Sequence, residues 1–144
     1  MIMKILMVCL GNICRSPMAE GIMRKLGGKK VEVDSAGTAN YHIGLQPDKR
    51  MIAKAFEHGI DISNLRARQF HSDDFNSFDL IFAMDSSNYQ NIISLAKHEN
   101  DKEKVKMILD NINVPDPYYG GVEGFEHVYQ LLNEACQNIL DNIE

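Results

Sequence analysis

Four short apolar runs alternate along the chain with longer segments of helical pattern, and this alternation limits the folds that are possible. The runs have the length and composition of buried strands. They cover residues 4–10, 31–35, 79–84 and 105–109. The first helical pattern begins at Ser16, and three further patterns cover residues 48–58, 86–98 and 125–143. Strands that alternate with helices form parallel sheets with helices on both faces. We therefore expect one three-layer α/β domain over residues 1–144, built on a four-stranded parallel sheet.

Length and charge exclude several classes of protein. No apolar run approaches the roughly 18 residues that a membrane helix needs, so we expect no membrane segment. Twenty acidic and fifteen basic residues give a net charge of -5, which disfavours general nucleic-acid binding. The three cysteines are too few for a disulfide framework, and no signal peptide is evident. We therefore expect a cytoplasmic protein. The histidines show no ligand spacing, so we expect no metal and no cofactor.

The segment between the first strand and the first helix has the composition of an anion-binding loop. Five residues separate Cys9 from Arg15, and a loop of this length can curl until its backbone N–H groups point inward. Gly11 and Asn12 tolerate the left-handed turns that the curl needs. The guanidinium of Arg15 matches two phosphate oxygens, and the following helix adds the positive end of its dipole. The expected phosphate-binding residues are Leu10, Gly11, Asn12, Ile13, Cys14, Arg15 and Ser16.

Cys9 lies at the mouth of this loop, where positive surroundings favour the thiolate over the thiol. A thiolate is a nucleophile, and the hydroxyl of Ser16 can donate a hydrogen bond to it. The alternative is a buried structural cysteine at the end of a strand. That interpretation explains neither Gly11 and Asn12 nor Arg15, so the sequence favours phosphoryl transfer to Cys9.

The segment from Cys9 to Pro17 resembles the phosphate loop of the low-molecular-weight protein tyrosine phosphatases. The resemblance covers essentially the whole chain, because five further segments match family segments in order and spacing. These segments are residues 34–38, 57–60, 67–69, 83–85 and 116–120. The resemblance implies an enzyme that hydrolyses phosphotyrosine through a phosphocysteine intermediate. It implies a phosphotyrosine-containing protein as substrate, allows a cognate tyrosine kinase as a partner, and leads us to expect a monomer.

Asp116 opens the motif Asp-Pro-Tyr-Tyr-Gly. The resemblance implies that it protonates the leaving oxygen and then activates the water that cleaves the phosphocysteine. From the residues alone, a turn aspartate before a proline is an equally good interpretation. The resemblance also implies an aromatic slot walled by Tyr41 and Tyr118, with Tyr119 beside them. Either wall tyrosine can equally be half-buried packing, and phosphorylation of Tyr118 or Tyr119 stays open.

In the resembling family a hydrogen-bond network supports the loop from below, and Asn12, Ser16, Ser35 and His58 match it. A histidine in the last turn of a helix can equally complement the helix dipole. Asp85 directly follows the third strand. It can orient the guanidinium of Arg15, or it can simply cap the next helix.

A second cysteine, Cys14, lies five residues after Cys9. A curled loop can bring the two sulfurs close enough to bond. We therefore hypothesise that an oxidant forms a Cys9–Cys14 disulfide, which protects Cys9 from irreversible oxidation. Cys136 lies on the apolar stripe of the last helical pattern, where core packing is the better interpretation.

Several other functions are weighed against phosphotyrosine hydrolysis. In protein-arginine phosphatases of the same fold, a threonine stands at the position of Ile13. Ile13 instead offers methyl groups that suit an aromatic ring and no hydroxyl for a guanidinium-like group. An arsenate reductase needs further relay cysteines after the loop, and residues 79–94 contain none. A phosphocysteine carrier has no use for Asp116. A silent phosphotyrosine-binding module has no use for Cys9 together with Asp116.

Overall fold

A four-stranded parallel sheet forms the centre of the molecule. The structure is a computed structural model, and it describes residues 2–118 and 120–143. The strands are β1 (Met3–Cys9), β2 (Val31–Gly37), β3 (Leu80–Ala83) and β4 (Val105–Met107). Their order in the sheet is β2-β1-β3-β4, and all three pairings are parallel. This arrangement confirms the predicted α/β fold with its four-stranded sheet.

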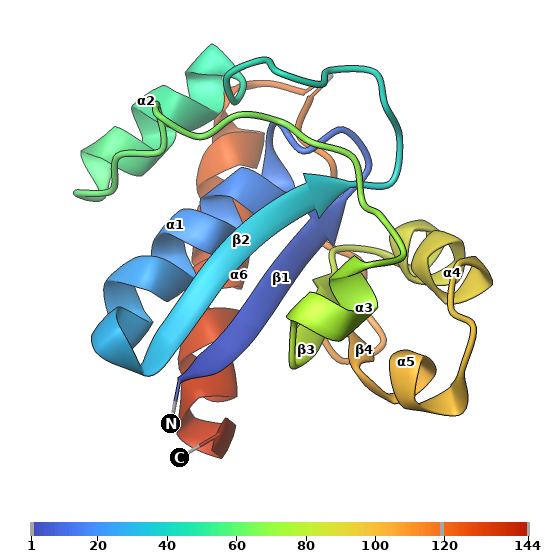
Figure 1. Cartoon of the computed structure of the whole chain (residues 1–144). Helices are drawn as coiled ribbons and strands as arrows, with labels where there is room; N and C mark the ends of the chain where they lie inside the picture. Colours follow the sequence, from blue (N-terminus) through green and yellow to red (C-terminus); the bar gives the residue numbers. More distant parts are fainter. Residues whose placement is uncertain (1, 119, 144) are drawn as a thin grey trace.

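Helices cover both faces of the sheet (Figure 1). They are α1 (Arg15–Gly27), the 3₁₀ helix η1 (Gly28–Lys30), α2 (Lys49–Glu57), α3 (Asp74–Ser77), α4 (Ser86–Ser94), α5 (Glu99–Glu103) and α6 (Val122–Ile143). On one face α1, α2 and α6 build the larger core, and on the other face α3 and α4 build the smaller one. None of the helices in the described part of the chain has the length and apolarity that a membrane crossing requires.

The central strand β1 separates the two cores. Ile5 and Met7 belong to the larger cluster, whereas Leu6 and Val8 belong to the smaller one. All four side chains are fully buried, as expected for a strand inside a parallel sheet with helices on both sides. Burial of each such side chain contributes about 1.5–3 kcal/mol, so β1 is held firmly and carries its last residue, Cys9, to a fixed position.

The helices depart from the sequence prediction in two respects. The predicted helix 86–98 is too long, because α4 ends at Ser94 and the chain is capped again at His98 before α5. The short helices α3 and α5 were not predicted, since four or five residues carry no readable period. Asp48 caps α2 by accepting a hydrogen bond from the Arg50 backbone N–H.

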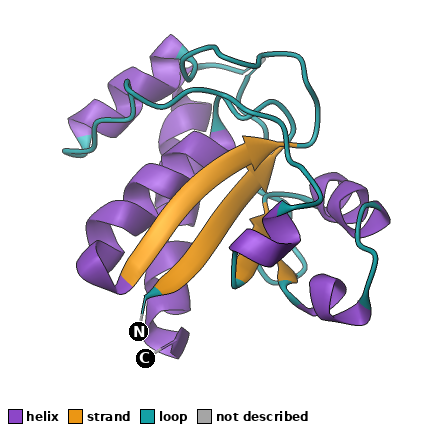
Figure 2. Cartoon of the chain, in the orientation of Figure 1, coloured by secondary structure: helices purple, strands orange, loops and turns teal. Residues whose placement is uncertain are grey.

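Long loops gather beyond the carboxyl ends of the strands (Figure 2). The loop 10–14 follows β1, the segment 38–48 follows β2, and Asp85 lies two residues beyond the end of β3. The segment after β4 returns to this edge, where the Val114 backbone N–H donates to the carbonyl oxygen of Met84. Residues from four separate parts of the sequence therefore meet at one end of the sheet, which is where ligands bind in folds of this kind.

Candidate functional site

A cavity of about 110 Å³ lies at this end of the sheet, and most of the sequence-predicted site residues line it. Its lining consists of Cys9, Leu10, Gly11, Ile13, Cys14, Arg15, Tyr41, His42, Asp116 and Tyr118. Tyr119, the third tyrosine named from the sequence, lies outside the described residues. The cavity thus joins a thiol, a guanidinium and a carboxylate with two aromatic rings of the predicted slot.

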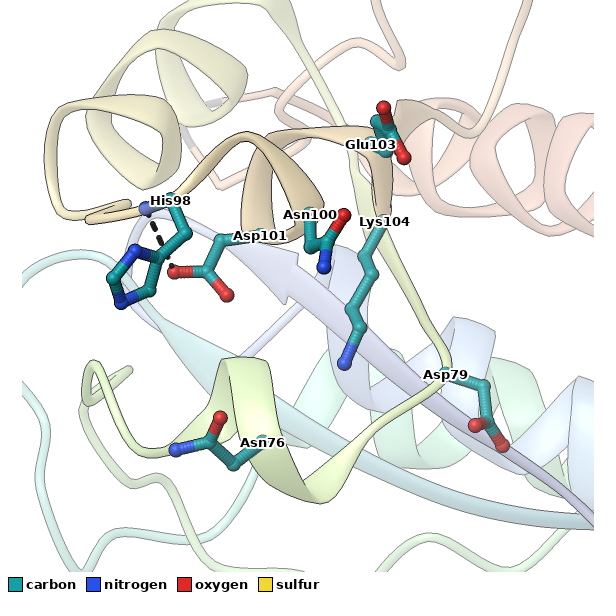
Figure 3. Close-up of a pocket in the computed structure, with 7 residues that line it drawn as sticks. All are labelled: Asn76, Asp79, His98, Asn100, Asp101, Glu103 and Lys104. Atoms are coloured by element: carbon teal, nitrogen blue, oxygen red, sulfur yellow. Dashed lines mark hydrogen bonds between the residues drawn. The ribbon is translucent and has the colours of Figure 1, made fainter.

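A larger and more open hollow of about 490 Å³ lies elsewhere on the molecule (Figure 3). Its lining residues are Asn76, Asp79, His98, Asn100, Asp101, Glu103 and Lys104. No nucleophilic thiol faces it, and the ammonium of Lys104 already donates to the carbonyl oxygen of Phe75. The chemistry therefore favours the smaller cavity as the functional site.

Asn12 holds the curled loop in shape. Its φ of 59° lies in the left-handed region, which asparagine tolerates better than most residues. Its Nδ2 donates to Ser16 Oγ at 2.8 Å and to Ser35 Oγ at 2.9 Å, and its Oδ1 accepts from the Arg68 backbone N–H at 3.0 Å. Three hydrogen bonds in a buried setting fix both the side chain and the unusual backbone conformation.

The thiol of Cys9 sits between β1 and the first turn of α1. Its Sγ lies 3.0 Å from Ser16 Oγ, and the side chain is buried apart from its face toward the cavity. Cys9 thus lies before the amino end of a thirteen-residue helix, where the positive end of the helix dipole is found.

Arg15 is fixed from two sides. Its Nη1 donates to Asp85 Oδ2 at 2.7 Å and to the carbonyl oxygen of Val114 at 3.0 Å. Burial alone would lower the pKa of this guanidinium, but the negative charges at Cys9, Asp85 and Asp116 outweigh burial and raise the pKa above its ordinary value. Arg15 therefore stays charged although only 3% of its side chain is exposed.

Asp85 plays both roles that the sequence left as alternatives. Its Oδ2 accepts from Arg15, and its Oδ1 accepts from the Asn88 backbone N–H at 2.7 Å, which caps α4. One carboxylate thus joins the start of α4 to the cation of the loop.

Asp116 reaches the cavity from the segment after β4. Its Oδ2 lies 3.6 Å from Nη2 of Arg15, and its Oδ1 accepts from the Tyr118 backbone N–H at 3.0 Å. Arg50 holds this segment by donating to the carbonyl oxygen of Tyr118 at 2.7 Å, while its own carboxylate partner is Asp48. The Asp116 segment is therefore tied to the start of α2 as well as to the loop.

The aromatic walls contain one ring that the sequence reasoning missed. His42 lies beside both Tyr41 and Tyr118, with a distance of 6.3 Å between its ring centroid and that of each tyrosine. Its ring also covers Gly11, where an added Cβ would come within 2.8 Å of His42 Cδ2. The adjacency of His42 to Tyr41 was the available signal. Tyr41 itself is 70% exposed and forms the outer rim.

The prediction that His58 supports the loop is wrong. His58 follows the last residue of α2, and its ring stacks on Tyr129 of α6 with the centroids 3.6 Å apart. Its Nε2 lies 2.9 Å from Oε1 of Glu126. The ring therefore joins α2 to α6, because the end of α2 faces the last helix and not the loop.

The residue that completes the supporting network is Glu20, which the sequence reasoning missed. Its Oε1 accepts from Ser35 Oγ at 2.6 Å, and its side chain is buried on α1. Glu20 lies four residues after Ser16, so the two share a face of one helix, and this spacing was the signal available in the sequence.

The cysteines are free in this structure, and all three are buried. Burial, together with the negative charges at Asp48, Cys9 and Asp116, raises the pKa of the Cys14 thiol far above its ordinary value. Cys14 therefore stays a neutral thiol beside the cavity, and the Cys9–Cys14 disulfide stays a prediction. Across residues 2–118 and 120–143, no three histidine, cysteine or carboxylate side chains gather to hold a metal ion.

Known proteins of one family match the chain over nearly its whole length. The family model described as low molecular weight phosphotyrosine protein phosphatase matches residues 4–144. A Synechocystis sp. protein named for the low molecular weight protein-tyrosine-phosphatases, slr0328, is 50% identical, covering 98% of this chain and 96% of that protein. The low molecular weight protein-tyrosine-phosphatase YfkJ of Bacillus subtilis is 40% identical, covering 98% of this chain and 96% of YfkJ. A crystal structure of a protein tyrosine phosphatase from Entamoeba histolytica has a TM-score of 0.93 at 41% identity, covering 98% of this chain and 96% of that one. The chain therefore belongs to the low molecular weight phosphotyrosine protein phosphatase family.

Proposed function

We propose that this protein hydrolyses phosphotyrosine in phosphoproteins, and small aryl phosphates, through a phosphocysteine formed on Cys9. One observation carries the proposal. The sulfur of Cys9, the guanidinium of Arg15 and the carboxylate of Asp116 come from three separate segments and face one cavity of about 110 Å³. A nucleophile, a cation and an acid in one small cavity are the groups that phosphoryl transfer requires.

Substrate binding uses the loop and the rings. The phosphoryl oxygens accept hydrogen bonds from the backbone N–H groups of the loop and from Arg15, whose other donors are already held by Asp85 and Val114. The phenyl ring of the substrate lies between Tyr41 and Tyr118, at the mouth of the cavity.

The reaction then has two steps. The Cys9 thiolate forms a bond to phosphorus while the bond to the phenolic oxygen breaks, and Asp116 gives its proton to that oxygen. Asp116, now a carboxylate, takes a proton from water as the water oxygen attacks phosphorus. The sulfur–phosphorus bond breaks, phosphate leaves, and the Ser16 hydroxyl, 3.0 Å away, stabilises the departing thiolate.

The test is turnover of p-nitrophenyl phosphate at mildly acidic pH with no added metal. We expect many turnovers by the wild-type protein. Cys9→Ser abolishes turnover because a hydroxyl is a far weaker nucleophile here, but it keeps vanadate binding, since the loop donors remain. Calorimetry measures the binding. Release of only one equivalent of p-nitrophenol per chain, with the phosphoryl group kept on Cys9, would instead indicate a phosphocysteine carrier, and no release would indicate a binding module.

The side chain of Ile13 supports phosphotyrosine over phosphoarginine as substrate. It lines the cavity with methyl groups, which contact an aromatic ring favourably and offer no hydroxyl to a guanidinium. The same assay, run with a phosphotyrosyl and a phosphoarginyl peptide, separates the two substrate classes. Faster hydrolysis of the phosphoarginyl peptide would contradict the assignment.

Residues 1–144 act, in this proposal, as one monomeric domain in the cytoplasm. A single sheet with two core clusters supports the single domain, and a reducing compartment suits an enzyme that depends on a free thiol. A cognate tyrosine kinase as partner stays a prediction.

A further inference from the structure

A buried carboxylate that the proposed mechanism does not use lies beneath the loop. Glu20 is only 2% exposed, its Oε1 accepts from Ser35, and its Oε2 lies 2.6 Å from Nη2 of Arg24. Burial raises the pKa of this carboxyl, although the hydrogen bond from Ser35 and the charge of Arg24 offset part of the effect. A carboxylate in such a place needs a reason, because burying it costs free energy even when it is paired.

The hydrogens of this cluster can be assigned because an ionised carboxylate only accepts. The hydroxyl of Ser35 must therefore donate to Glu20, at 2.6 Å. Having used its only hydrogen, Ser35 Oγ can only accept from Nδ2 of Asn12, at 2.9 Å. The Asn12 amide cannot turn over, because its Oδ1 accepts from the Arg68 backbone N–H.

The same logic continues to the sulfur. The second hydrogen on Asn12 Nδ2 goes to Ser16 Oγ at 2.8 Å, so Ser16 accepts there and keeps its own hydrogen. The acceptors within reach of that hydrogen are Cys9 Sγ at 3.0 Å and the carbonyl oxygen of Ala36 at 3.5 Å. The sulfur is the nearer acceptor and, as a thiolate, the stronger one.

We propose that Glu20 is a positioning residue for the phosphatase reaction. Acting through Ser35, Asn12 and Ser16, its carboxylate sets the direction of the hydrogen bonds so that the Ser16 hydroxyl donates to Cys9 Sγ. Glu20 touches neither substrate nor the loop backbone. The inference rests on the proposed role of Cys9 as nucleophile, and it explains why a negative charge is kept under a phosphate-binding loop.

Replacement of Glu20 by glutamine tests the direction of these hydrogen bonds. Because Arg24 donates to the second oxygen, the glutamine turns its own oxygen toward Arg24 and its NH₂ group toward Ser35. Two donors, from the glutamine and Asn12, then compete for Ser35 Oγ. The hydrogen bonds between Glu20 and Cys9 therefore no longer have one fixed direction. We expect the pH at half-maximal alkylation of Cys9 by iodoacetate to rise by about one unit. Peptide mapping identifies the alkylated cysteine.

A second substitution should partly restore the direction of the hydrogen bonds. In Glu20→Gln with Arg24→Met, the donor that fixed the glutamine is gone, so its oxygen is free to face Ser35 again. We expect the alkylation midpoint to return toward the wild-type value, while Arg24→Met alone changes it little. A purely structural role for Glu20 predicts the opposite, because removing a second partner would only loosen the cluster further.

The matched control is Glu126→Gln, another glutamate on a helix, whose partner His58 lies away from the loop. It should leave the alkylation profile unchanged. An unchanged midpoint in folded Glu20→Gln, or an equal rise in Glu126→Gln, would overturn the proposal. If Glu20→Gln does not fold, Ser35→Ala removes the next link, and an unchanged midpoint there overturns it equally. Alkylation needs no turnover, so this result stands apart from the test of phosphatase activity.

Discussion

Asp116 is far more exposed than Arg15, with 41% of its side chain accessible against 3%, and this difference suits their proposed roles. A phosphate clamp works best when it is rigid and dry, whereas a group that exchanges a proton with water must meet water. Within the turn, Oδ1 of Asp116 accepts from the Tyr118 backbone N–H. Its Oδ2 lies 3.6 Å from Nη2 of Arg15, and in the proposed mechanism it faces the leaving group.

Replacement of Asp116 by alanine tests this role at the level of one residue. A good leaving group such as p-nitrophenolate departs with little protonation, whereas a basic phenolate needs a proton. We expect Asp116→Ala to slow phenyl phosphate by about 10²–10⁴-fold and p-nitrophenyl phosphate much less. The measurement is kcat/KM over a series of aryl phosphates.

Equal slowing for every leaving group would remove Asp116 from the acid role. Asp61→Ala is the control, because Asp61 is an exposed aspartate whose hydrogen-bond partner is Ser63. That variant should keep the leaving-group dependence of the wild-type protein.

At the scale of elements, the end of β2 supports the loop by direct backbone contact. An added Cβ on Gly37 would lie 2.7 Å from the carbonyl oxygen of Leu10 and 3.1 Å from the carbonyl carbon of Gly11. The backbones of Thr38 and Ala39 also donate to the carbonyl oxygens of Cys9 and Leu10. A glycine is needed here because two stretches of backbone approach each other closely.

Gly37→Ala should therefore push the loop out of position. We expect kcat/KM to fall by at least about tenfold, since small displacements of binding groups are costly, while the fold loses about 1–3 kcal/mol of stability. Calorimetric titration with phosphate measures the effect on the loop directly. Gly121→Ala is the matched control, because an added Cβ there meets none of the described residues within 4 Å. Wild-type phosphate affinity in Gly37→Ala would show that the loop absorbs the methyl group without moving.

The elements were predictable where the apolar pattern is long, and not where local turns decide. The run 4–10 became β1 (Met3–Cys9), because a continuous apolar run of this length is buried wherever the chain places it. The predicted helix 86–98 ended early because Asp101 offers its carboxylate to the backbone N–H groups of Lys97 and His98, which starts a new helix. The sequence carried that capping signal, but the helical period continued through it.

The site was predictable in so far as strand ends share one edge of the sheet. Cys9 ends β1 and Asp85 lies just beyond the end of the neighbouring strand β3, so their meeting near Arg15 follows from topology. His58 was assigned wrongly because a residue at a helix end carries no record of which neighbour it will face. Glu20 was missed because a single acidic residue on a helix is normally solvated, and only the packing of α1 on β2 makes it a partner of Ser35.

At the scale of the whole molecule, α2 and α6 form a second support behind the cavity. Arg50 of α2 carries its guanidinium over the ring of Phe125 at 4.7 Å and also holds the Asp116 segment. At the other end of α2, His58 and Lys54 both lie within ion-pair distance of Glu126 on α6. The segment with the proposed acid is therefore anchored to α2, and both ends of α2 contact the beginning of α6.

The contacts of His58 and Lys54 with Glu126 should make the free energy of unfolding depend on pH in the acid range. The hydrogen bond from His58, followed by that from Gln130, lowers the pKa of Glu126 from 4.5 to about 2. A carboxyl whose pKa is lower in the folded state stabilises the fold above its unfolded pKa, and this contribution is lost as the pH falls through the folded pKa. The contribution of Glu126 should therefore be complete above about pH 4.5 and vanish toward pH 2.

Glu126→Gln removes that contribution, so its free energy of unfolding should depend less on pH between about 4.5 and 2. We expect the variant to be less stable than the wild-type protein at pH 5.5, and the difference to shrink steadily between about pH 4.5 and 2, where Glu126 of the wild-type protein takes up its proton. Urea unfolding followed by circular dichroism at several pH values measures the free energies. Glu134→Gln, an exposed position on the same helix, should show no such convergence. A difference that stays constant down to pH 2.5 would mean that Glu126 stabilises the helix pair by packing, and that the charge of the carboxylate has no part in holding α2 against α6.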